Sequence, residues 1–444
     1  MFGKIPEKSK MKLLQIQLGK FKQLVADGFF HILVGNVLIK AAAFVSSVVI
    51  VRLVSKAEYA YLGYADNLFQ YINLLSGLGL STAILKFCAP SVSKGINKYY
   101  YRLAMRVGVL FQLIISVVLV WVVMIIKIPF PNAKGIVAML VLYPTLTQVI
   151  TTMQSYIRAH LDNKLFAKIG VVQTIALLLF SVPLALLLGV YGAVAARYLS
   201  LLIVIVMAYK FTSTSLPADI ETSVPAQKER TLFWKLAISM MLANLFSMIM
   251  PLNEQFLINN YIKDEITSAN YKVAFLIPSQ IVFVTNSVVV YMFPKVAQLG
   301  DKLQEAFRIT IKTEALLAAV ILGMCLVGYF VSPILIVCVY GERYSDAIEL
   351  SKAYWVVYGI NAGFRILPMN MLPAMGSTLF NSILSVISCI AHGALLYVLL
   401  EEKGIWGAPY ALVIVYAISG CAYWAYICIR CRRKRKQLAK IIDG

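Results

Sequence analysis

The hydrophobic positions along the chain form long apolar runs that are separated by short polar or charged segments. A helix that crosses a bilayer needs roughly 20 mostly apolar residues, because it rises only about 1.5 Å per residue. Twelve such runs fit between the turn and charge signals. They are expected near 31–54, 61–84, 103–126, 135–157, 166–188 and 190–210, and then near 232–258, 267–293, 312–339, 350–373, 377–400 and 405–429. The pattern predicts an all-α integral membrane protein of about twelve transmembrane helices.

The polar segments between the runs divide the chain into five predicted parts. These are a basic interfacial N-terminal segment (1–30), an N-terminal six-helix bundle (31–210), a cytoplasmic linker (211–231), a C-terminal six-helix bundle (232–429) and a basic cytoplasmic tail (430–444). The first segment mixes lysines with leucines and phenylalanines, as a helix lying on an anionic leaflet would. A disordered basic leader is the alternative for that segment.

Composition and charge exclude several classes of protein. The 444 residues are 60% hydrophobic and 14% charged, which excludes a water-soluble fold. The net charge of +21 does not indicate nucleic-acid binding, because the Lys and Arg residues lie at the ends of apolar runs. Most of these cations fall on one side of the membrane when both termini are cytoplasmic, as the positive-inside rule expects. The seven cysteines lack the spacing of a disulfide framework.

Neither a nucleotide-driven pump nor a metal site is predicted. The sequence has no G-x-x-x-x-G-K-[ST] motif, and His31, His160 and His392 are far apart along the chain. The outer loops are short, whereas a membrane-embedded polymerase or ligase needs a sizeable loop or an acid and base cluster. We therefore expect a protein that is not an enzyme and has no cofactor.

The two halves of the chain are related by an internal repeat. Gly189-Val-Tyr-Gly192-Ala193 recurs 215 positions later as Gly404-Ile-Trp-Gly407-Ala408, and each copy opens the sixth helix of its half. Because each half has an even number of predicted helices, both halves enter the membrane from the same side. Such parallel repeats predict two bundles with a central cavity between them.

Four basic residues fall inside the predicted membrane helices, where a charge costs about 2.5 to 3.5 kcal/mol and marks a functional candidate. They are Lys40, Arg197, Lys272 and Arg365. Asn36, Lys40 and Ser47 recur at helical spacing and predict a polar stripe in the first helix, and Asp66, Gln70 and Asn73 predict another in the second. An alternative remains open in which these charges form structural pairs, for example Lys40 with Asp66.

Short motifs at successive helix junctions carry a resemblance to a known family. They are Arg52-Leu-Val-Ser-Lys-Ala-Glu58-Tyr59, Ser76-Gly-Leu-Gly79-Leu-Ser-Thr-Ala83, Tyr156-Ile-Arg158, Gly341-Glu-Arg-Tyr344, Leu372-Pro-Ala374-Met-Gly376 and the repeated Gly-x-x-Gly-Ala. In this order the chain resembles the Wzx-type polysaccharide flippases of the multidrug/oligosaccharidyl-lipid/polysaccharide (MOP) exporter superfamily. The resemblance covers nearly the whole chain and implies a MATE-like fold.

The resemblance also implies where transport takes place. The family aligns its first, second, seventh and eighth helices along the groove between the bundles. The residues expected to bind substrate in the cavity are Lys40, Arg365, Lys272, Arg197, Asn36, Gln70 and Asn73. Where the family often has an Asp followed by Arg or Lys, this chain reads Asn253-Glu254-Gln255. Glu254 therefore lacks an adjacent cation, and we expect Glu254 and Asp66 to hold a coupling ion, H⁺ or Na⁺.

The function expected from these observations is a flippase. It would move a polyprenyl-diphosphate-linked oligosaccharide repeat unit across the bacterial cytoplasmic membrane by alternating access, for surface polysaccharide biosynthesis. Its expected partners are this lipid-linked oligosaccharide, membrane lipids, a polysaccharide polymerase and glycosyltransferases. A cation-coupled multidrug exporter of the same superfamily is the main alternative, and a membrane-embedded polysaccharide polymerase or ligase is a weaker one.

Overall fold

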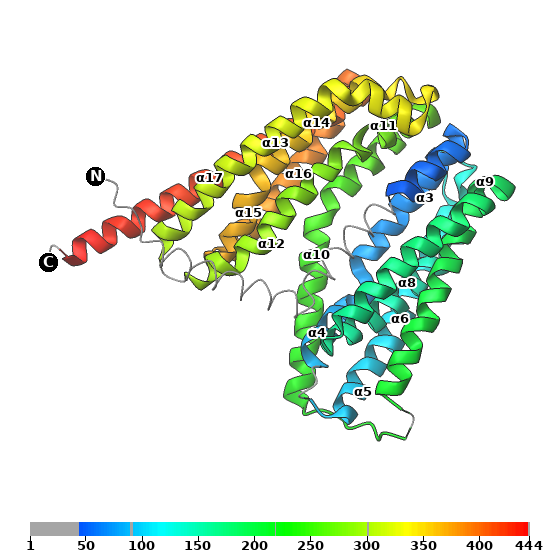
Figure 1. Cartoon of the computed structure of the whole chain (residues 1–444), viewed down its shortest axis with the longest axis horizontal. Helices are drawn as coiled ribbons and strands as arrows, with labels where there is room; N and C mark the ends of the chain where they lie inside the picture. The colour runs from blue at the N-terminus through cyan, green and yellow to red at the C-terminus, as the bar shows by residue number, and fades with distance from the viewer. Residues whose placement is uncertain (1–43, 89–91, 218, 300–301, 443–444) are drawn as a thin grey trace, which may run out of the picture. The chain divides into compact units, whose positions relative to one another are not determined.

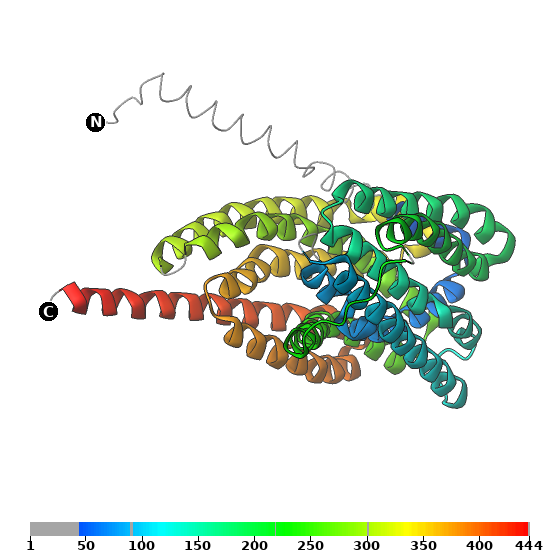
Figure 2. The same ribbon diagram turned by 90° about the horizontal axis from the view of Figure 1, so that it is seen from below.

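The computed structural model describes residues 44–88, 92–217, 219–299 and 302–442, and all regular structure in this part of the chain is helical (Figure 1). The helices of the first half are α3 (Lys56–Leu75), η1 (Ser76–Gly79), α4 (Leu80–Phe87), α5 (Lys94–Leu103), η2 (Ala104–Gly108), α6 (Val109–Ile125), α7 (Ala133–Met139), η3 (Leu140–Leu142), α8 (Tyr143–Ala159) and α9 (Asn163–Ser215). The helices of the second half are α10 (Gln227–Ile262), α11 (Glu265–Leu276), η4 (Pro278–Ile281), α12 (Val282–Gln298), α13 (Leu303–Tyr340), η5 (Glu342–Tyr344), α14 (Ala347–Ile360), η6 (Asn361–Arg365), α15 (Ile366–Ala374), α16 (Thr378–Lys403), η7 (Gly404–Trp406) and α17 (Gly407–Ile442). Figure 2 shows α17 as a long helix that runs to the C-terminus.

The described helices account for the predicted membrane crossings. Within the residues that the structure describes, seven helical segments are long and apolar enough to span a bilayer. Two of them, Lys164–Ser215 and Leu379–Lys434, have 52 and 56 residues, which is enough for two crossings each. The helix α10, the pair α14 and α15, and the short helix Phe44–Leu53 match the three remaining predicted crossings. The predicted all-α membrane fold is confirmed, and the helix count is broadly consistent with about twelve.

Many side chains on the outside of the helices are apolar, as expected for a protein surrounded by lipid chains. Large apolar side chains such as Leu187, Phe330 and Leu316 are strongly exposed, although a soluble protein would bury many of them. Several lie in the candidate spans rather than in loops. This exposure is expected where lipid chains replace water around the helices.

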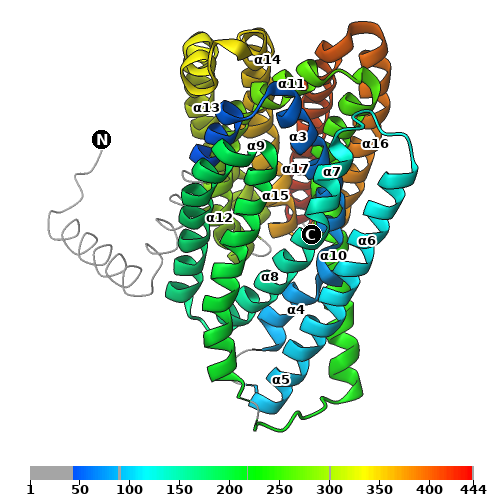
Figure 3. The ribbon, with the colours of Figure 1, turned by 90° about the vertical axis from the view of Figure 1, so that its right-hand side faces the viewer.

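The described chain packs as two compact units. The first contains the described residues before 55 together with 75–122 and 136–242, and the second contains 55–74, 123–135 and 243–442. Within the first unit, α8 lies against α9 (Figure 3) and Tyr100 stacks on Phe233 with ring centroids 4.4 Å apart. The core of the second unit is built around side chains such as Ile321, Leu367 and Tyr423. These units are defined by packing and combine segments that are separate in the sequence, so they do not test the predicted domain boundaries, which remain predictions.

The repeated glycines have the same backbone geometry in both halves. Gly189 has φ 59° and ψ −135°, and Gly404 has φ 55° and ψ −138°, a conformation that side chains rarely permit. A Cβ on Gly192 would lie 1.8 Å from the Leu184 carbonyl oxygen, and one on Gly407 would lie 2.5 Å from the Leu399 carbonyl oxygen. Leu184 and Leu399 are also 215 positions apart. This agreement supports the internal repeat.

Two predicted helices are broken where the sequence predicts continuous ones. In the run 61–84, Gly77, Leu78 and Gly79 all have positive φ, and η1 separates α3 from α4. The freed Gly77 N–H donates to Gln112 Oε1 at 3.1 Å, which satisfies a backbone group that would be costly to leave unpaired in a membrane. In the run 267–293, η4 begins at Pro278 and separates α11 from α12. Broken helices of this kind are typical of transporters.

Candidate functional site

A buried carboxylate lies inside the second unit. Glu254 is in α10, three residues after Pro251, and only 3% of its surface is exposed. Pro251 lacks a backbone N–H, so it weakens the hydrogen-bond ladder of the helix just before Glu254. An ionised group in such a position is costly unless hydrogen bonds compensate for lost water.

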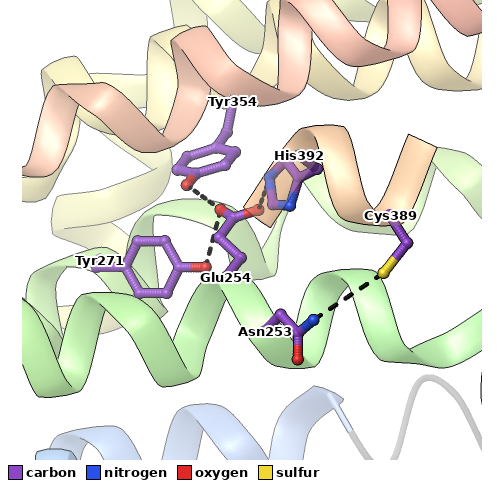
Figure 4. Close-up of polar contacts among 6 residues, drawn as sticks. All are labelled: Asn253, Glu254, Tyr271, Tyr354, Cys389 and His392. Carbon is purple, nitrogen blue, oxygen red and sulfur yellow. Dashed lines mark hydrogen bonds and ion pairs between the residues drawn. The ribbon is translucent and has the colours of Figure 1, made fainter. Parts of the chain in front are cut away.

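Three side chains from three other helices surround this carboxylate (Figure 4). The Tyr354 hydroxyl of α14 donates to Glu254 Oε1 at 2.8 Å, and the Tyr271 hydroxyl of α11 donates to the same oxygen at 3.0 Å. His392 of α16 is fully buried, and its Nε2 lies 3.6 Å from Glu254 Oε2. This distance is longer than a hydrogen bond, and the pair is ionic only when His392 is protonated. The four residues form a compact site that can hold a proton or a small cation.

A second polar group lies in the same unit around Arg365. This residue ends the π-helical turn η6, and only 9% of it is exposed. Its Nε donates to Ser419 Oγ at 2.9 Å and its Nη1 donates to Asn361 Oδ1 at 3.2 Å. The guanidinium also lies 4.9 Å from the centre of the Tyr416 ring. Among the described residues, Arg365 is thus a buried cation held by hydrogen bonds and a ring and not by a carboxylate. Turns of π-helix of this kind often occur at functional sites.

Lys272 forms an ion pair in the second unit. Its Nζ lies 3.8 Å from Asp66 Oδ2 and 4.6 Å from the centre of the Tyr59 ring. Gly63 makes room for it, because a Cβ there would lie 3.0 Å from Lys272 Cδ and Nζ. The pair joins α3 to α11, and Gln255 Nε2 of α10 donates to the Gly63 carbonyl at 3.1 Å. These contacts hold three helices together beside a charged pair.

The predicted substrate residues are distributed unevenly. Lys40 and Asn36 lie outside the described residues. Arg197 is in the first unit, with its guanidinium 5.9 Å from the centre of the Tyr143 ring. Gln70 is exposed and Asn73 is half-buried. In the second unit, the structure brings together Lys272 with Asp66, and Glu254 with the network of Tyr271, Tyr354 and His392.

The sequence interpretation of the Glu254 surroundings is incomplete. Asn253 and Gln255 leave Glu254 without a cation beside it in the sequence, but two tyrosine hydroxyls donate to it and a histidine lies beside it in space. His392 is far from the other two histidines along the chain, yet it is close to Glu254 in space. An ionisable group in the middle of an apolar run is a signal for function, and His392 carried that signal. The hydroxyls of Tyr271 and Tyr354 gave no such signal, because these residues are two of the 25 tyrosines in the chain.

No grouping suited to a metal ion is found in the described part of the chain, where no three His, Cys, Asp or Glu side chains come together. The Glu254 site has one carboxylate, one imidazole and two hydroxyls. Such a set favours a proton or a weakly held alkali cation over a tightly held transition metal.

The fold and its long apolar helices define a class, the multi-pass membrane proteins. The chain belongs to the polysaccharide biosynthesis protein family, whose sequence pattern matches residues 49–349. This match and the structures below confirm the predicted relation to the Wzx-type proteins of the MOP superfamily. No curated protein sequence matches the chain.

Solved structures of MOP transporters share the fold. An inward-facing multidrug resistance MATE transporter is 13% identical, with a TM-score of 0.65, over 90% of this chain and 96% of its own. An outward-facing structure of such a transporter is also 13% identical, with a TM-score of 0.58, over 94% of this chain and 97% of its own. A MOP transporter from Pyrococcus furiosus, whose reversed binding-pocket polarity suggests a different function, is 12% identical, with a TM-score of 0.59, over 92% of this chain and 95% of its own.

Proposed function

We propose that this protein is a flippase that carries a polyprenyl-diphosphate-linked oligosaccharide repeat unit across the membrane, for surface polysaccharide biosynthesis. The observation that carries the proposal is the match of residues 49–349 to a polysaccharide biosynthesis family in a chain with a transporter fold. In the proposed mechanism the protein alternates between inward- and outward-open states, the sugar crosses inside the protein, and the lipid tail stays in the bilayer. No bond is made or broken, so the protein is not an enzyme.

Buried cations support an anionic substrate. A diphosphate is best held by guanidinium and ammonium groups together with hydroxyl and amide donors. Arg365 uses Nε and Nη1 for Ser419 and Asn361, and a guanidinium has five N–H donors in all. No described residue accepts a hydrogen bond from Nη2, so its donors remain for a phosphate oxygen. Lys272 has a carboxylate beside it, so its charge is largely compensated and it serves the proposal less well.

Glu254 is the proposed coupling residue. A carboxylate that is buried with two hydroxyl donors and an imidazole can exchange its proton for Na⁺, or lose and regain the proton during the transport cycle. Asp66, also expected to couple, has Lys272 at 3.8 Å and is therefore the weaker candidate. The gradient that drives transport would act on the second unit through Glu254.

Reconstituted transport tests this function directly. The purified protein is placed in liposomes with a fluorescent undecaprenyl-diphosphate oligosaccharide, and exposure of the sugar to an external quencher is followed with time. We expect protein-dependent flipping that accelerates under a proton or sodium gradient. Export of a cationic dye under the same gradient, without lipid flipping, would favour the multidrug exporter instead.

A matched pair of acid variants tests the coupling role. Glu254→Gln keeps the shape of the side chain but removes its charge, and we expect transport to lose its dependence on the ion gradient. Glu314→Gln in α13 is the control, because Glu314 is also buried in the second unit but has no hydrogen-bond partner among the described residues. Equal gradient dependence in the wild type and in Glu254→Gln would remove Glu254 from the coupling mechanism.

The proposed location is the bacterial cytoplasmic membrane, with both termini in the cytoplasm. The run Arg432-Arg433-Lys434-Arg435-Lys436 opposes export of the C-terminus. The polymerase and the glycosyltransferases of the same biosynthesis are the proposed partners. A C-terminal alkaline phosphatase fusion should be inactive and a fluorescent protein fusion should be active, and the reverse result would contradict this topology.

A further inference from the structure

A basic cavity lies between the first turns of α13 and the membrane exit of α17, away from the groups described above. Its volume is about 380 Å³, and its polar lining consists of Gln304 and Arg308 from α13 and Arg432 from α17. None of the described residues that line it carries a carboxylate. Within the described part of the chain, neither guanidinium has a hydrogen-bond or ion-pair partner. Two unpaired guanidinium groups at one cavity form a site for an anion.

The cavity lies at the membrane boundary of two helices. One candidate span begins at Leu303, so Gln304 is in its first turn, and Arg432 begins the basic run Arg432-Arg433-Lys434-Arg435-Lys436 that follows the apolar part of α17. The Cys431 thiol donates to the Leu303 carbonyl at 3.6 Å, which holds the end of α17 beside the start of α13. The guanidinium groups are therefore at the level of lipid head groups and not in the hydrocarbon core.

The rest of the lining is apolar. On α13, Phe307 directly precedes Arg308 and Ile311 lies about one turn further into the span, and on α17 Cys428 lies about one turn before Arg432 on the membrane side. Ile311 is 43% exposed, so this side of the cavity is open to lipid chains. A polar end at the interface and an apolar end below it match the two parts of a phospholipid.

We propose that this cavity binds the phosphate group of an anionic membrane phospholipid, such as phosphatidylglycerol, with the upper part of an acyl chain on Phe307 and Ile311. Basic pockets between transmembrane helices are suited to anionic lipid head groups. Free phosphate would gain nothing from the apolar side. A transported lipid must reach both faces of the membrane, whereas this site lies at one interface only. The bound lipid bridges α13 and α17 and stabilises the second unit.

The test compares two double variants of the full-length protein. Arg308→Gln with Arg432→Gln removes both guanidinium groups from the cavity. Lys312→Gln with Arg433→Gln is the matched control, because it removes two positive charges from the same helices at exposed positions that do not line the cavity. Both are purified in mild detergent and checked for monodispersity and helical content, and phosphatidylglycerol binding is measured by native mass spectrometry. Phosphatidylcholine serves as the zwitterionic reference lipid.

We expect the cavity variant to bind phosphatidylglycerol at least about tenfold more weakly than the wild type, and the control to stay within about twofold. Added phosphatidylglycerol should raise the apparent Tm of the wild type and the control but not that of the cavity variant. Equal weakening in both variants would show non-specific charge attraction and overturn the proposal. Loss of undecaprenyl diphosphate binding alone, with phosphatidylglycerol binding intact, would overturn it too. These measurements do not depend on flipping, so they stand or fall independently of the proposed function.

Discussion

Replacing the repeated glycines Gly192 and Gly407 with alanine tests whether the backbone packs closely at these two positions. Gly393, an ordinary helical glycine, is the comparison. At Gly192 a Cβ would meet the Leu184 carbonyl oxygen at 1.8 Å and the Leu184 carbonyl carbon at 2.3 Å. At Gly407 it would meet the same atoms of Leu399 at 2.5 Å. These obstacles are backbone atoms, so no side-chain rotation can relieve the overlap. By contrast, a Cβ on Gly393 in α16 would have nothing within 4 Å.

The expected effects on the stability of the folded protein therefore differ in sign between these positions. Overpacking that forces the backbone to move costs about 1 to 3 kcal/mol and occasionally more, and we place Gly192→Ala at about 3 kcal/mol and Gly407→Ala at about 2 kcal/mol. Gly393→Ala lies within a helix and should be stabilising by about 0.5 to 1 kcal/mol, because alanine loses less backbone entropy on folding. The order of stability should be Gly393→Ala above the wild type, then Gly407→Ala, then Gly192→Ala.

Differential scanning fluorimetry of each purified variant in one detergent, with membrane abundance from a C-terminal tag, measures this order. Because unfolding of a large membrane protein is rarely two-state, the ranking of apparent Tm values is compared and not the free energies. If Gly192→Ala is as stable as Gly393→Ala, the close approach of Gly192 to the Leu184 carbonyl is refuted. The argument for equivalent turns in the two halves would then fail as well.

Three further predictions address the charged residues. Lys40→Arg should keep most flipping and Lys40→Ala should lose most of it at normal membrane abundance, if Lys40 holds a phosphate by charge; equal activity of the two would refute this. Lys272→Ala should reduce the abundance of folded protein, and adding Asp66→Asn should restore part of it, because the single change removes the cation beside a carboxylate. Asp264 caps α11, and hydrogen bonds from Thr267 hold the pKa of its carboxyl below the ordinary 3.8. Its stabilisation is therefore present above that pH and is lost as pH falls through the lowered pKa, so the Tm deficit of Asp264→Ala should be full at pH 7 and shrink in acid.

The sequence by itself determined that the protein lies in a lipid bilayer and that its fold is helical. An apolar run of about 20 residues has one stable solution in a bilayer, the helix, because every backbone group must find its partner within the segment. Counting such runs therefore predicted the all-α membrane fold. The Gly-x-x-Gly-Ala repeat could also be recognised in the sequence. Gly189 and Gly404 both have positive φ, a local backbone conformation that favours glycine.

The breaks in helices were less readable. Pro278 signals a break by its missing N–H, but the positive φ of Leu78 is unusual for its residue type and depends on partners elsewhere in the chain. The Gly77 N–H can leave its helical ladder because Gln112, from another helix, accepts the bond. Such a bond depends on two helices meeting, and hydrophobic periodicity does not record that.

Only the tertiary structure decided the surroundings of the charged groups. Tyr271, Tyr354 and His392 lie on three helices far apart in the sequence, yet all approach one carboxylate. Lys272 could have faced a cavity, but it lies beside Asp66. Periodicity shows which face of a helix is polar, but the rotation and depth of each helix are set by packing against its neighbours. The partner of a buried charge follows from that packing, so it could not be predicted from the sequence of its own helix.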